Sequence, residues 1–183
     1  MRLTVTLKRQ LRAYLNFAKL FTWGINMSSK PKEKPLDKEE RVELRELHEK
    51  ALKVVGEDKV LRKDGRVTNR IELVAEYVTQ NKGKLDLDTA EDVSFALGVL
   101  LGAEYCESMK WEWTHLTYSD GFEGFAVIAK DRSILVFPIL VVYKILTDKN
   151  QANNIKMNFN LVKSGGGRQN LSKIKPKAYV PLM

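Results

Sequence analysis

"LGVLLGAEYCESMKWEW", residues 97–113, is the stretch in which the apolar period of this 183-residue chain changes from about 3.6 to two. Its first half continues a helical spacing of apolar residues that begins at Val93. Near its end, Trp111 and Trp113 alternate with polar residues such as Glu112, as in a strand with two different faces. The stretch therefore predicts a long helix followed by a strand, and hence a fold of the α+β class.

Two glycines interrupt this helical pattern. Gly98 and Gly102 are four residues apart, so they lie on one face of the helix. Each costs the helix about 1 kcal/mol relative to alanine. We expect close packing of a neighbouring helix or sheet against this side-chain-free face to compensate, with a groove for an external helix as the alternative.

Three helices are predicted before the strand. Asp37 is expected to cap the first, with Glu40 completing a capping box. Apolar residues at helical spacing over 67–78 predict the second, which an NKG turn ends. Asp88 or Thr89 is expected to cap the third.

After the first strand, turn signals divide the chain into short elements. The Asp-Gly pair in SDGF (119–122) predicts a tight hairpin, after which GFAVIAK and SILVF form a second and a third strand. Pro138 suits the first position of a helix over 138–147, although the many β-branched residues leave an edge strand as the alternative. A last short helix is expected near residues 155–162.

These elements predict an α+β fold in which two or three N-terminal helices pack on a small antiparallel sheet of about three strands, followed by one or two short helices. We expect three regions along the chain. Residues 1–34 form a basic N-terminal extension and linker, residues 35–163 a single α+β domain, and residues 164–183 a basic C-terminal tail.

The positive charge of the chain lies at its two ends. The formal net charge is +8. Residues 1–34 have eight Lys/Arg and one acid, and residues 149–183 have seven Lys/Arg and no acid. The segment 35–148 has 16 Lys/Arg against 22 Asp/Glu and is therefore acidic. This distribution argues against a basic face for duplex binding, and leaves non-specific attraction of nucleic acid to the tails.

The segment 1–26 has three possible interpretations. Its five Lys/Arg, absence of acids and apolar stripe are typical of a helix that contacts a membrane surface, and also of an organelle transit segment. Alternatively, it precedes the natural start, because the sequence from Met27 reads like a beginning. No run of apolar residues is long enough to predict a transmembrane helix.

Few residues suggest catalysis. Cys106 and His115 are a conceivable nucleophile and base, but no motif surrounds them, and with His48 they lack the spacing of metal ligands. The glycines of KSGGGR (163–168) match neither phosphate-binding fingerprint. We therefore predict no catalytic, metal or cofactor-binding residues, and no cofactor. A single cysteine fits a reducing compartment, and we expect a cytoplasmic protein.

A protein partner is the function that these features favour. Tryptophans often anchor interfaces, and neighbouring acids suit a basic partner. The candidate partner-binding residues are Trp111, Glu112, Trp113, Asp120, Phe122 and Glu123.

The order of motifs from Leu97 to about Val162 resembles a family of small bacterial domains of uncharacterised function. The shared motifs are LGVLLG, WEW, the Asp-Gly hairpin, and VFP followed by VVYK. The resemblance implies the fold and a bacterial source, and it supplies no catalytic residues. Helices that cover a small antiparallel sheet are also similar in architecture to immunity proteins, which neutralise toxins.

The leading hypothesis is thus a non-enzymatic protein-binding domain, of immunity or adaptor type, that engages a basic protein surface. A second hypothesis is a peripheral membrane or polyanion-associated protein that uses its basic ends. A third is an enzyme with an unrecognised carboxylate site at Glu104, Glu107 and Glu112.

Overall fold

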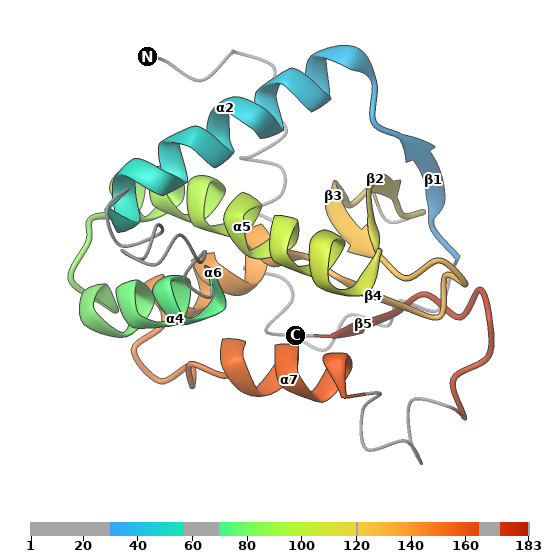
Figure 1. The fold of residues 1–183 in the computed structure, drawn as a ribbon. Helices are drawn as coiled ribbons and strands as arrows, with labels where there is room; N and C mark the ends of the chain where they lie inside the picture. Colours follow the sequence, from blue (N-terminus) through green and yellow to red (C-terminus); the bar gives the residue numbers. More distant parts are fainter. Residues whose placement is uncertain (1–29, 57–69, 120, 165–172, 183) are drawn as a thin grey trace, which may run out of the picture.

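The computed structural model describes residues 30–56, 70–119, 121–164 and 173–182. The elements are, in chain order, β1 (Lys32–Pro35), α2 (Lys38–Val55), α4 (Arg70–Asn81), α5 (Leu87–Met109), β2 (Glu112–Thr117), β3 (Glu123–Ile128), β4 (Ile134–Val136), α6 (Pro138–Thr147), α7 (Ile155–Lys163) and β5 (Val180–Leu182). Helix α5 crosses the centre of the fold, and its C-terminal end reaches the sheet (Figure 1).

Local capping signals fix where the helices begin. Asp37 caps α2, and its side chain and that of Glu40 form both hydrogen bonds of the predicted capping box. The predicted cap of α5, Asp88 or Thr89, is wrong by at least two residues. Asp86 caps the helix instead, because its side chain accepts the Thr89 N–H at 2.9 Å, and α5 therefore begins earlier than predicted. Helix α6 begins at Pro138 as predicted, which rules out the edge-strand alternative.

The predicted layout of the fold is wrong. The chain is α+β, but its sheet has five strands in the order β1-β2-β3-β4-β5, rather than about three. The sheet is mixed, because β4 and β5 are parallel while the other neighbours are antiparallel. One strand, β1, precedes every described helix, and β5 follows them all.

The two additional strands come from segments without a strand pattern. Strand β1 lies at the end of the expected linker, and β5 lies in the expected C-terminal tail. Strand β1 is mostly exposed and has the sequence KEKP, and β5 has the sequence VPL. Both are edge strands, where proline is tolerated because one side of the backbone needs no partner. Their partners are the free edges of β2 and β4, which local sequence does not reveal.

The core consists of two groups of buried side chains, and α5 contributes to both. Ala96 and Leu97 belong to a group to which α4, α6 and α7 contribute most, whereas Phe95 and Val99 belong to a group formed with α2, the strands and the first turns of α6. Consecutive residues of α5 therefore face different neighbours, as expected of a helix that is apolar on all sides.

The two glycines of α5 lie against different elements. A Cβ atom built on Gly98 would lie 2.4 Å from Cα of Ile139 in α6. A Cβ atom on Gly102 would lie 2.1 Å from Cζ2 of Trp113, just before the middle of β2. The absence of side chains thus admits the backbone of α6 at one position and an indole ring at the other.

None of the helices in the described part of the chain is both long enough and apolar enough to cross a membrane. The segment 1–26, for which membrane contact is one of three predictions, lies outside the described residues.

Candidate functional site

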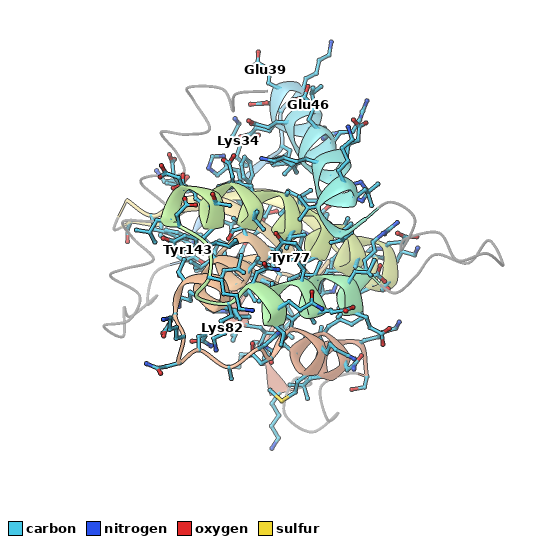
Figure 2. The ribbon with its side chains drawn as sticks, turned by 90° about the vertical axis from the view of Figure 1, so that its left-hand side faces the viewer. Lys34, Glu39, Glu46, Tyr77, Lys82 and Tyr143 are labelled. Carbon is cyan, nitrogen blue, oxygen red and sulfur yellow. The ribbon has the colours of Figure 1, made fainter. Side chains whose placement is uncertain are left out.

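An open groove of about 850 Å³ lies between the N-terminal half of α2, strand β1 and the β2–β3 hairpin. Figure 2 shows three of its residues, Lys34, Glu39 and Glu46, at the end of the molecule where α2 lies. The lining residues are mostly charged; they are Lys34, Asp37, Lys38, Glu39, Glu40, Val42, Glu43, Glu46, His115, Thr117 and Glu123.

Strand register and helix capping bring these side chains together. Lys34 of β1 is the register partner of His115 in β2, and Thr117 of β2 is the partner of Glu123 in β3. From the other wall, Glu40 reaches His115 from the first turn of α2. The hairpin closes with a bond from the Tyr118 N–H to the Phe122 carbonyl, and Gly121 has a φ of 85° that suits this turn.

His115 is the most enclosed polar side chain of the groove. Its side chain is only 10% exposed, and Nδ1 lies 3.0 Å from Oε1 of Glu40. A carboxylate accepts hydrogen bonds, so Nδ1 carries the proton and donates it. In the neutral ring, Nε2 is then an acceptor. No hydrogen bond to Nε2 is present among the described residues: Oε2 of Glu123 is 3.9 Å away, beyond hydrogen-bond distance.

The groove is strongly acidic. Six carboxylates and two lysines line it, so its formal charge is −4 with a neutral histidine. One of the lysines, Lys34, lies 3.1 Å from Asp37. The pKa of Asp37 is lowered, first by the backbone N–H of Glu40 and then by the Lys34 side chain. Lys34 therefore already has an intramolecular partner, and the groove attracts further cations.

The described part of the chain contains no group of three His, Cys, Asp or Glu side chains that could hold a metal ion. The arrangement suits instead a cationic group that donates hydrogen bonds. An ammonium or guanidinium group can bond to Glu123 and to Nε2 of His115 at once.

The structure separates the candidate partner-binding residues into two groups. Glu112 begins β2 and pairs with Ile128, while Glu123 begins β3 and pairs with Thr117. The two groups thus lie at opposite ends of a six-residue hairpin, about 17–20 Å apart. They do not form a single patch.

At the end of the hairpin that contains Glu112, most of the candidate side chains already make intramolecular contacts. Glu112 lies 2.5 Å from Nη2 of Arg132, which also binds Glu33 of β1 at 2.8 Å. Trp111 packs against Tyr105 with ring centroids 5.5 Å apart. Trp113 is half-buried over Gly102.

At the opposite end of the hairpin, Glu123 is the one described candidate residue that lines the groove. Phe122 is buried, with its ring 5.2 Å from that of Phe137, so it belongs to the core. Asp120 lies outside the described residues.

The residues considered for catalysis do not form a site. Burial, and then the charge of Glu112, raise the pKa of the Cys106 thiol to about 12, so it is a poor nucleophile. Glu104 and Glu107 both form ion pairs with Arg70, which lies 3.6 Å from Glu104.

Sequence reasoning missed the α2 wall of the groove. Glu39, Glu43 and Glu46 are spaced by four and three residues, so they form a stripe along one face of α2. This spacing was a usable signal, but acidic residues on an amphipathic helix ordinarily only face water. Their position opposite His115 and Glu123 depends on tertiary structure.

Comparisons with known proteins give one match. Residues 73–159 match the family described as a domain of unknown function (DUF3806). No curated protein and no solved structure matches the chain. The matched segment includes His115 and Glu123 but neither β1 nor α2.

The match confirms the resemblance of a segment of the chain to an uncharacterised domain family, which the motifs from Leu97 onward predict, and it begins earlier, at Leu73. It covers a little less than half of the chain. Residues 73–159 are thus similar to a domain of unknown function, and the match says nothing of the partner or the activity.

Proposed function

We propose that this protein binds a lysine- or arginine-rich segment of a protein partner in the acidic groove between α2 and the β2–β3 hairpin. The main support for this proposal is the excess of carboxylates over lysines, six against two, around one concave surface. Charge complementarity of this kind speeds association and selects against acidic partners.

Glu123 and His115 together offer a specific binding position for one cationic side chain of the partner. Glu40 holds the imidazole with Nε2 toward the groove, 3.9 Å from Glu123. A guanidinium placed there would donate hydrogen bonds to both acceptors. These bonds would replace hydrogen bonds that the two acceptors otherwise make to water. An immunity or adaptor role, expected from the sequence, is one use of such binding.

A direct test is the fluorescence anisotropy of a fluorescein-labelled peptide of alternating arginine and alanine, titrated with the full chain. We expect saturable binding that weakens with salt, and none to a glutamate–alanine peptide. The triple variant Glu39→Gln, Glu43→Gln, Glu46→Gln and the single variant Glu123→Gln should each bind at least about tenfold more weakly.

The matched control is Glu72→Gln with Glu76→Gln, two acids on the surface of α4. It should leave the affinity unchanged. Equal weakening by the control variant would contradict the proposed function. It would also be contradicted if no form of the chain, variants of its basic N-terminal segment included, bound the arginine peptide.

A further inference from the structure

We propose that residues 1–29 of this chain occupy the acidic groove in cis and compete there with the basic partner. The inference rests on the proposed function, because it names an intramolecular ligand for the same site. It is carried by the chemistry of the groove and by the place where the described chain begins.

The groove offers what a basic segment needs. His115 is nine-tenths buried, and its Nε2 faces the groove without a hydrogen-bond partner among the described residues. Next to it, Glu123 supplies a carboxylate that is 37% exposed. Val42, 44% exposed on α2, gives the same surface an apolar contact. A ligand with cationic and apolar side chains therefore matches the groove better than a simple cation does.

The chain itself contains such a segment. Residues 1–29 have five basic side chains and no acidic one, and the basic residues are Arg2, Lys8, Arg9, Arg12 and Lys19. Leucine and aromatic side chains are interleaved among them. Five cations would offset the groove's formal charge of −4.

The segment also starts beside the groove. The described chain begins at Lys30, and Lys34, only four residues later, lines the groove. Five extended residues, the separation of position 29 from Lys34, span at most about 17 Å. A short tether of this kind gives an effective concentration of the order of millimolar. Even a weak affinity for a basic segment would keep the groove occupied.

Zero-length carbodiimide cross-linking of the full chain tests occupancy, because it joins only amines and carboxylates that are in contact. We expect amide links from Lys8 or Lys19 to Glu39, Glu43, Glu46 or Glu123, found by mass spectrometry in the monomer fraction. Links that form only in covalent dimers would assign the groove to the segment of a second copy and overturn the proposal. Links to Glu72 and Glu76 at equal frequency would overturn it as well.

Peptide competition separates this inference from the proposed function. In the full chain, Arg9→Glu with Arg12→Glu and Lys19→Glu should raise the affinity for the arginine–alanine peptide at least about tenfold, by freeing the groove. The matched control, Lys173→Glu with Lys175→Glu and Lys177→Glu, changes the net charge equally at the other end of the chain. It should raise the affinity little.

Each outcome has one meaning. If the parent chain and both variants bind the peptide equally, residues 1–29 do not occupy the groove, and the proposed function stands. An equal gain in both variants shows a general charge effect and also overturns the inference. If even the variant with the reversed N-terminal charges fails to bind, the proposed function fails, and the inference fails with it.

Discussion

Nδ1 of His115 lies 3.0 Å from Oε1 of Glu40, and this contact joins the first turn of α2 to strand β2 across 75 positions of sequence. The other oxygen of the same carboxylate accepts the backbone N–H of Asp37 at 2.8 Å. One side chain therefore completes the cap of a helix and fixes the orientation of a buried imidazole. Because Glu40 holds the ring proton on Nδ1, Nε2 is left as a hydrogen-bond acceptor in the groove.

Glu40→Gln should reverse the tautomer of His115 while keeping the fold. The glutamine oxygen can still accept from Asp37, and its amide N–H can donate to Nδ1, which forces the ring proton onto Nε2. The free energy of unfolding should fall by only about 1 kcal/mol. Binding of the arginine–alanine peptide should weaken at least about tenfold, because a donor now faces the cation.

Nitrogen-15 NMR of the imidazole rings reports the tautomer directly. His48→Gln assigns the signals, because the chain has only two histidines. A ring that keeps its proton on Nδ1 in Glu40→Gln would contradict this account of the groove.

Acid should destabilise the fold partly through three aspartates at caps and turns. The pKa of Asp37 is lowered mainly by the Glu40 N–H, that of Asp86 by the Thr89 hydroxyl, and that of Asp131 by the Ser133 hydroxyl. A lowered folded-state pKa gives stability that is complete above the unfolded-state value near 3.8 and is lost as the pH falls through the lower folded value.

Urea unfolding at a series of pH values below about 5 measures this loss. The triple variant Asp37→Asn, Asp86→Asn, Asp131→Asn keeps polar caps that do not titrate. Its free energy of unfolding should fall less steeply with acid than that of the parent chain. Parallel curves for the two proteins would show that these aspartates contribute nothing to the pH dependence.

Gly98→Ala should destabilise the protein although alanine favours helices. The new Cβ would lie 2.4 Å from the Ile139 Cα, and a backbone atom in a packed helix cannot move aside alone. Forced overpacking costs about 1–3 kcal/mol, against a helix gain of about 1 kcal/mol. Because the clash involves backbone, we expect the upper half of this range, a net loss of about 1–2 kcal/mol in urea unfolding. A variant as stable as the parent would mean that α5 and α6 are not in this close contact.

Gly102→Ala should instead displace a side chain. The nearest atoms to its Cβ belong to the outer ring of Trp113, which is half-buried and can turn toward solvent. The loss of stability should therefore be smaller than for Gly98→Ala, below about 1 kcal/mol, because the helix gain offsets it. Tryptophan emission should shift to longer wavelength. An unchanged spectrum would contradict the contact between Gly102 and Trp113.

Cys106 should be almost inert in the native protein. Its pKa of about 12, against 9.0 for an unperturbed thiol, lowers the thiolate fraction about a thousandfold near neutral pH. A disulfide-exchange reagent should react rapidly in guanidinium and very slowly without it. Glu112→Gln removes the second cause of the raised pKa and should speed the native reaction modestly. Rapid labelling of the native chain would contradict the burial of this thiol.

Sequence alone determined the helices, the hairpin and the α+β class. Capping at Asp37, the proline at position 138 and the Asp-Gly turn act through atoms a few residues apart, so their signals are local. The change of period at residues 97–113 is local in the same sense. His115 and Glu123 were noted as chemically interesting, but nothing local placed them together.

Tertiary structure decided the edges of the sheet and the groove. Strands β1 and β5 carry no alternating pattern, and they exist because β2 and β4 present unpaired backbone groups at their free edges. The groove joins a stripe of acids on α2 to a hairpin some 75 residues later. Both features depend on which distant segments of the backbone meet. The residues that flank a hydrogen-bond donor or a charge in the sequence do not indicate which distant group will become its partner.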